Sequence, residues 1–209
     1  GPIEADKVHE GIYASDIILG DYAVIEVFLP AGTVEQFSLK IDNAIHGIDS
    51  SINGFDNQSI SERAFGDSQP CNVNVVCPEG DDFLDEIRAV CLILRNTTVE
   101  HCTGTLITNA CSDFTPFILT ANHCVDGENL NAFVFRFNYE SPFCNPNTNP
   151  HPNTWISFNG AQFRAGWEGT DFALLELNNP VVGTSGIRFA GWDRRNLIPD
   201  NSTYIHHPQ

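Results

Sequence analysis

The sequence predicts an all-β fold, and two observations favour it. Short runs rich in β-branched and aromatic residues recur between Gly, Pro and Asn turn signals, whereas no long helical periodicity is present. Seven cysteines are confined to residues 71–144 of the 209, which places a disulfide framework in the same part of the chain as most of these runs. Together they predict a β-barrel or sandwich that begins near Cys71.

Residues 1–70 form a separate predicted unit, because they hold no cysteine. Two strand-like runs, Tyr22 to Leu29 and Phe37 to Ile41, lie between turn signals. The stretch 66–70 is polar and rich in turn residues, which is typical of a linker. We therefore expect a small β-rich N-terminal segment and linker over 1–70 and a domain over 71–209.

Several runs of the second unit are predicted as strands because they combine β-forming residues with flanking turn signals. They are Arg88 to Leu94, Cys102 to Ile107, Pro116 to Thr120, Ala132 to Asn138, Trp155 to Phe158 and Asp171 to Leu177. The stretch 144–154 is too rich in proline for a central strand and is predicted as a loop.

Charge and hydropathy narrow the function classes. Ten basic against 27 acidic residues give a net charge of −17, and such a surface repels phosphate backbones, so we expect no nucleic-acid partner. Solubility in an extracellular or salty medium and steering of cationic substrates both remain explanations of this acidity. No apolar run approaches the roughly 20 residues that span a bilayer, so no membrane partner is expected. The chain has no methionine and no visible signal peptide, and we expect it to be a piece of a longer precursor.

The cysteines lie at Cys71, Cys77, Cys91, Cys102, Cys111, Cys124 and Cys144, with no Cys-x-x-Cys pair. This spacing disfavours zinc ribbons and thioredoxin-like redox sites, and it favours disulfides formed in an oxidising compartment. We therefore expect a secreted protein without a metal or other cofactor. The odd count leaves one thiol over, which is either free or paired with a cysteine of a missing segment.

The residues that carry chemistry are His123 and Asp171. His123 follows an apolar run, and Asp171 opens another. A carboxylate at the mouth of one strand can accept a hydrogen bond from an imidazole at the end of another, which fixes the tautomer and stabilises the imidazolium formed in acyl transfer. Taken alone, His123 could be a structural histidine, and Asp171 could be a turn or helix-capping residue. Cys102 and Cys124 bracket the histidine loop, and a bridge between them would hold it to the preceding strand.

Three motifs resemble the signatures of the trypsin-like serine peptidases. They are Cys-Thr-Gly-Thr-Leu at 102–106, Thr-Ala-Asn-His-Cys at 120–124 and Asp-Phe-Ala-Leu-Leu at 171–175. Within that family the chain is similar to the bacterial lysyl endopeptidase branch, which has counterparts of residues 71–80, 190–195 and 205–208. The resemblance extends from Cys71 nearly to the end, and residues 1–70 resemble, less specifically, the β-rich tail of the propeptide in such precursors.

The resemblance implies a chymotrypsin-like fold of two antiparallel β-barrels, of which the first and the start of the second are present. His123 would be the general base and Asp171 its orienting carboxylate. The bridges Cys77–Cys144 and Cys102–Cys124 carry over, and Cys71, unpaired here, would pair with a cysteine beyond Gln209. Cys91 and Cys111 lack counterparts, and we expect a third bridge between them.

The serine nucleophile is the main departure from the family pattern. The family has a Gly-x-Ser-Gly turn well after the aspartate, because backbone amides around that serine hold the oxyanion. Thr184-Ser185-Gly186 follows Asp171 too closely, and Ser68 precedes the histidine. The second barrel should therefore be truncated, with the serine in a missing C-terminal segment, and the chain alone should be inactive.

The expected function is secreted serine endopeptidase, acting on peptide or protein substrates after lysine or another basic residue. Residues 71–209 hold seven arginines and no lysine, which would protect a lysine-specific peptidase from itself, although compositional drift explains it equally well. The alternatives are a non-enzymatic, peptidase-like binding or adhesion module and a metal hydrolase. His206 and His207 could suggest a metal, but adjacent residues of a strand face opposite sides, which favours a structural or surface role.

Overall fold

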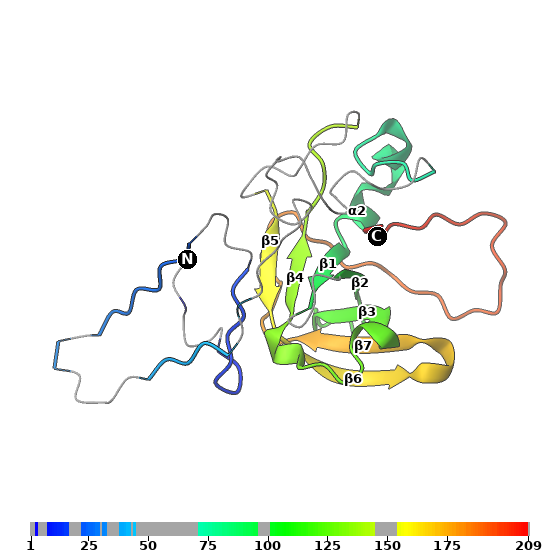
Figure 1. Cartoon of the computed structure of the whole chain (residues 1–209). Helices are drawn as coiled ribbons and strands as arrows, with labels where there is room; N and C mark the ends of the chain where they lie inside the picture. The colour runs from blue at the N-terminus through cyan, green and yellow to red at the C-terminus, as the bar shows by residue number, and fades with distance from the viewer. Residues whose placement is uncertain are drawn as a thin grey trace.

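Within the part of the chain that the structure describes, seven strands form one antiparallel sheet in the order β5-β4-β1-β2-β3-β7-β6 (Figure 1). This computed structural model describes residues 3, 8–16, 22–29, 31–32, 38–42, 44, 71–95, 101–144 and 154–208. The strands are β1 (Val90–Leu94), β2 (His101–Ile107), β3 (Phe117–Ala121), β4 (Val134–Phe137), β5 (Ile156–Asn159), β6 (Ala161–Trp167) and β7 (Phe172–Leu177). The helical pieces are η2 (Pro78–Phe83), α2 (Leu84–Ile87), η3 (Asn122–Cys124), η4 (Leu130–Ala132) and η5 (Glu168–Thr170). The predicted all-β class is confirmed.

Each predicted strand run of the domain overlaps an observed strand, and only β6 was missed. Its sequence, Ala-Gln-Phe-Arg-Ala-Gly-Trp, has no β-branched residue and follows a glycine. β6 lies at the edge of the sheet, is mostly exposed and pairs with β7 through a register shift between Phe163 and Ala165. Pairing with a neighbour therefore stabilises this strand more than local propensity does.

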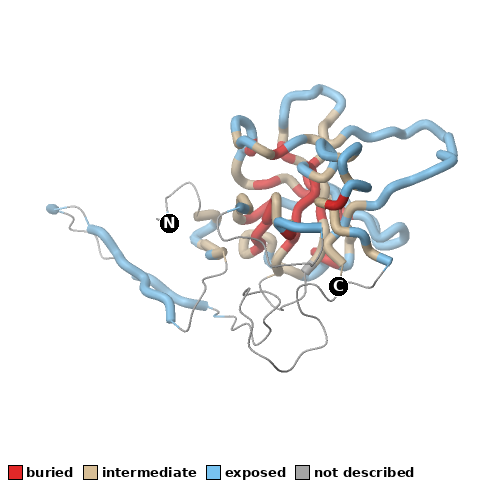
Figure 2. The backbone as a smooth tube through the Cα atoms, turned by 90° about the horizontal axis from the view of Figure 1, so that it is seen from above, coloured by how far each residue is buried: buried red, intermediate tan, exposed pale blue. Residues whose placement is uncertain are grey.

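Alternating side chains of the strands fill one hydrophobic core. In β7 the buried positions are Ala173, Leu175 and Leu177, and in β4 the rings of Phe135 and Phe137 enter the same cluster. Figure 2 shows the buried backbone gathered in the centre of the domain. The sheet therefore curls around a single core, as a first barrel requires.

Gly104 of β2 is the glycine of the Cys-x-Gly-x-Leu motif, and packing explains why a glycine is needed there. A Cβ at this position would lie 2.6 Å from Ile118 Cγ2 and 3.2 Å from Cys91 Sγ. Core atoms of two neighbouring strands thus occupy the space that a side chain would need. The glycine of the motif is therefore required for packing and not for chemistry.

Both predicted N-terminal strands are wrong, because the described residues 22–29 and 38–41 form no strand. Residues 22–29 have no regular secondary structure, and their large side chains are exposed, with Tyr22 at 81% and Phe28 at 86%. Propensity alone suggested a strand, but a strand requires a partner for its backbone hydrogen bonds. Phe37, which begins the second predicted run, and the whole predicted linker, residues 66–70, lie outside the described residues.

Beyond β7 the described chain, to residue 208, contains turns and extended stretches but no further strand. A single parallel bridge joins Ala190 to Ile107 at the end of β2. The start of the second barrel, implied by the resemblance, is therefore not represented by a strand in this part of the molecule. No helix among the residues described is both long and apolar enough to cross a lipid bilayer.

Two disulfides hold the domain, and both were expected from the resemblance. Cys77 is bonded to Cys144, and Cys102 to Cys124. The first connects the chain before η2 to the loop after β4. The second connects β2 to the turn that carries His123.

The expected Cys91–Cys111 bridge is wrong, since both thiols are free. Cys91 is fully buried in β1, and its sulfur packs over Gly104. Cys111 lies in an exposed turn, where its backbone N–H donates to the Asn109 side chain. A thiol directed into the core cannot reach an exposed turn, so the two sulfurs do not meet. Cys71 is free and exposed, in agreement with its predicted unpaired state in this chain.

Alkylation of the folded, unreduced chain should modify Cys71 and Cys111 rapidly and spare Cys91. Burial raises the pKa of the Cys91 thiol well above its ordinary value, so the reactive thiolate is both rare and inaccessible. Peptide mass spectrometry after a timed iodoacetamide pulse, with and without denaturant, measures this directly. Modification of Cys91 at the rate of Cys111 in the folded protein would contradict the structure.

Candidate active site

His123 lies in the short 3-10 turn η3, directly after β3. The backbone N–H groups of Val125 and Asp126 both donate to the carbonyl of Asn122, which closes the turn. Cys124 is 3% exposed and is bonded to Cys102, so the residue next to His123 is anchored in the domain. The His123 side chain itself is 69% exposed. The fold thus holds the backbone of this residue firmly and leaves its imidazole accessible.

Asp171 reaches His123 from the neighbouring strand. β3 and β7 are paired, with Ala121 opposite Phe172, so the ends of the two strands meet. Oδ2 of Asp171 lies 2.6 Å from Nδ1 of His123, and Oδ1 accepts a hydrogen bond of 2.9 Å from the backbone N–H of the same residue. The carboxylate therefore fixes both the ring and the backbone of the histidine.

Asp171 adopts a left-handed conformation, with φ 51° and ψ 39°. Its own N–H donates to the Glu168 carbonyl, and its carbonyl accepts from the N–H of Asn122. Aspartate tolerates this region better than most residues, and such conformations persist where the surroundings hold them in place. The sequence predicted Asp171 as a site residue, but the unusual backbone that aims its carboxylate was not readable from the pattern.

The pairing determines which imidazole nitrogen is available. An ionised carboxylate can only accept hydrogen bonds, so Nδ1 of His123 carries a hydrogen, and in the neutral imidazole Nε2 is the nitrogen with the free lone pair. That nitrogen can take a proton from a hydroxyl, and Asp171 then stabilises the imidazolium. The arrangement is suited to general-base chemistry.

The pKa of the Asp171 carboxyl is lowered from its ordinary value of 3.8. The largest cause is the hydrogen bond from the backbone N–H of His123, followed by the bond to its side chain. Because the folded-state pKa is depressed, the stabilisation exists above the ordinary value and is lost as the pH falls through the folded-state pKa. At neutral pH the carboxylate is therefore ionised.

A carboxyl-detected NMR titration should place the midpoint of Asp171 below 3.8. In the His123→Ala variant the midpoint should rise only part of the way back, because the backbone N–H of residue 123 remains and contributes the larger share. A return to the full ordinary value would show that the imidazole alone sets the pKa of this carboxyl.

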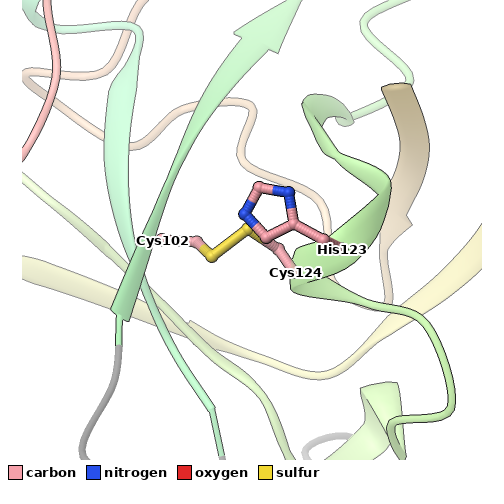
Figure 3. Close-up of side chains that lie close together, drawn as sticks. All are labelled: Cys102, His123 and Cys124. Carbon is pink, nitrogen blue, oxygen red and sulfur yellow. A yellow bond between two sulfur atoms is a disulfide. The ribbon is translucent and has the colours of Figure 1, made fainter. Parts of the chain in front are cut away.

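Cys102, His123 and Cys124 form the one cluster of three potential metal ligands in the described ranges, with ligand atoms within 4.8 Å of one another (Figure 3). The two sulfurs are bonded to each other, so neither is a thiolate that could bind zinc. Nδ1 of the histidine faces Asp171. These residues do not fit a metal centre, and the bridge acts as a support for the histidine turn.

Gly166 of β6 lies beside the histidine turn and belongs to none of the sequence motifs. A Cβ there would lie 3.0 Å from Oδ1 of Asn122 and 2.8 Å from the Phe163 ring. The glycine thus lets β6 approach the turn closely. An isolated glycine inside a strand is the signal that could have indicated this close approach.

Ser185 is exposed and lies in a tight surface turn. Gly183 and Gly186, on either side, have positive φ angles, and Gly186 is adjacent to the side chains of Asn138 and Arg88. Those residues flank β4 and β1, and that Ser185 is not the nucleophile stays a prediction. Ser68 lies outside the described residues.

The adjacent histidines near the C-terminus have different environments. His206 is exposed, whereas His207 is partly buried. The backbone N–H of His207 donates to Oγ1 of Thr103, and its ring lies 6.3 Å from the ring of Tyr139. These contacts therefore favour a structural or surface role for the two histidines over a role as metal ligands.

A known protein family and several solved structures are similar to this chain. The family described as "Lysyl endopeptidase, C-terminal domain" matches residues 65–209, well over half of the chain. Among solved structures, the scabies mite inactivated protease paralogue S-D1 is similar with a TM-score of 0.38 and 15% identity over 57% of this chain and 46% of that one. Paralogue S-I1 gives 0.37 and 20% over 56% and 49%. The chain spans about half the length of these structures, and by its family match it belongs to the lysyl endopeptidase C-terminal domain family.

Proposed function

We propose that this chain is the histidine- and aspartate-bearing half of a secreted serine endopeptidase. His123 acts as general base and Asp171 as its orienting carboxylate. The nucleophilic serine comes from a segment that this sequence does not include. The observation that carries the proposal is the 2.6 Å approach of Nδ1 of His123 to Oδ2 of Asp171.

The proposed reaction is acyl transfer to a serine. Nε2 of His123 removes the hydroxyl proton as the serine oxygen bonds to the peptide carbonyl carbon, and it returns that proton to the leaving amine. Water then repeats the sequence to release the acyl group and restore the serine. Asp171 remains ionised throughout, which its lowered pKa supports.

Substrate class and compartment also belong to the proposal. The family match and the absence of lysine from residues 71–209 support cleavage after lysine. The two disulfides support export, because such bridges form in oxidising compartments.

The test compares the 209-residue chain with the product of the same gene extended through its downstream coding sequence. Only the extended protein should react with a fluorophosphonate probe and hydrolyse lysyl amides. His123→Ala in that protein should lower kcat on the order of 10⁶-fold, whereas Ser185→Ala should leave it unchanged.

Two results would contradict the proposal. One is hydrolysis by the 209-residue chain that is lost on His123→Ala. The other is an extended protein that has no probe-reactive serine, which would favour the peptidase-like binding module instead. Arginyl and lysyl substrates of matched sequence, compared by kcat/KM, separate the specificity from the activity.

A further inference from the structure

Arg136 is a buried charge on the face of the sheet that points away from the core. It lies in β4 between Phe135 and Phe137, which enter the core, so alternation directs it to the opposite face. Its side chain is nevertheless only 1% exposed. A guanidinium removed from water is costly unless a counter-charge and hydrogen bonds compensate. The outer face of β4 must therefore be covered by something that carries negative charge.

Two aromatic rings enclose this guanidinium. Its central carbon lies 4.8 Å from the centroid of the Tyr139 ring and 4.6 Å from that of the Trp155 ring, within the range of cation–π attraction. Ser157 of β5 stands directly opposite Arg136 in the strand pairing. Arg136, Tyr139, Trp155 and Ser157 form what we call the arginine cage.

The carboxylate of Asp16, far away in sequence, occupies the cage. Oδ1 pairs with Nη2 of Arg136. Oδ2 accepts hydrogen bonds from Nε1 of Trp155 at 3.1 Å and from Oγ of Ser157 at 2.5 Å. Three donors thus converge on one acidic group. An ionised carboxylate, which only accepts hydrogen bonds, matches this set.

The backbone around Asp16 follows β5 in the antiparallel direction. The carbonyl of Ala14 accepts a hydrogen bond from the Asn159 side chain, and the Asp16 carboxylate accepts one from Ser157. Moving two residues forward from Ala14 to Asp16 thus corresponds to moving two residues backward along β5. Nearer the N-terminus, Oε2 of Glu10 accepts from the Asn131 side chain at 3.0 Å. Figure 1 shows this dark blue segment beside β5. Contacts therefore extend along the segment and do not rest on one ion pair.

We propose that the outer face of β4 and β5 is a peptide-binding site that recognises an aspartate carboxylate, and that residues 8–16 are its ligand within the same chain. In this ligand a tight turn, closed by His9 and Ile12, precedes the stretch 13–16 that carries Asp16. The site is separate from His123 and Asp171. It holds the N-terminal segment on the domain through side-chain recognition, so the segment should stay bound after the connecting chain is cut.

The distribution of lysines allows a direct test. The only lysines are Lys7 and Lys40, and the Lys40 side chain is 84% exposed. A lysine-specific protease should therefore separate a fragment containing residues 8–40 from residues 41–209 without cutting the domain. After such a cut the wild-type fragment should co-elute with the domain in size-exclusion chromatography.

Asp16→Asn should weaken retention of the fragment on the order of 10²-fold, because it leaves the buried guanidinium unpaired. Glu26→Gln is the matched control: it removes an exposed charge from the same fragment and should change nothing. Immediate release of the wild-type fragment, or equal retention of the Asp16→Asn and Glu26→Gln fragments, would overturn the proposal.

A second measurement does not depend on whether the Asp16→Asn chain folds. A synthetic peptide of residues 8–16 should displace the labelled fragment from the cut wild-type protein. The same peptide carrying Asp16→Asn should need on the order of 10²-fold higher concentration. Equal potency of the two peptides would show that the arginine cage does not recognise the Asp16 carboxylate.

Discussion

Replacing both Cys102 and Cys124 by alanine should lower the free energy of unfolding by about 3 kcal/mol. The bridge closes a loop of 22 residues, and a crosslink of that span removes about this much conformational freedom from the unfolded chain. Denaturant titration without reductant, followed by circular dichroism, measures the change. An unchanged midpoint and slope would show that the bridge adds nothing to stability.

The other bridge provides the matched control for the site. Cys77 and Cys144 are 67 residues apart, so their replacement should cost more, about 4 kcal/mol, on the same account. Only loss of Cys102–Cys124 releases the turn next to His123, however. The pKa of Asp171 should therefore rise toward its ordinary value in the Cys102/Cys124 variant and stay low in the Cys77/Cys144 variant. Equal behaviour of the two would refute a positioning role for the first bridge.

Phe135→Ala should destabilise the domain by about 3–5 kcal/mol. Phe135 is fully buried in β4 and belongs to the single core cluster, with the Phe133 ring centroid 6.3 Å from its own. Removing the ring loses buried apolar surface and leaves a cavity that paired strands cannot close. Equilibrium urea unfolding gives the value.

Phe143→Ala is the control for that substitution. Phe143 is 61% exposed, and the hydrogen bonds it accepts go to its backbone carbonyl, which alanine retains. Its loss should change stability by no more than about 0.5 kcal/mol. Similar costs at the two positions would mean that the core is not where the structure places it.

Much of the domain was predictable because its signals are local. Runs such as Val90–Leu94 and Phe172–Leu177 combine β-forming residues with turn signals at their ends. β6 was not predictable in this way, because its strand state depends on pairing with β7. The N-terminal run Tyr22 to Leu29 failed for the converse reason: its residues favour a strand but the structure shows none there.

The resemblance to the peptidase family predicted two of the three expected disulfides correctly and gave no information on the third. The pairings Cys77–Cys144 and Cys102–Cys124 followed from known motifs and were confirmed. The Cys91–Cys111 pairing followed only from a count of leftover cysteines. A count cannot tell which face of a strand a thiol occupies, and Cys91 occupies the core.

The sequence by itself determined the β class, the family resemblance and the identity of His123 and Asp171 as the candidate pair, because short motifs and strand propensities are properties of neighbouring residues. Only the tertiary structure decided that the two side chains meet, that Cys91 stays reduced and that Asp16 enters the arginine cage. Asp16 and Arg136 are 120 residues apart. No local pattern encodes such a pair, since burial of the guanidinium and its neutralisation arise only when the sheet and the segment pack together.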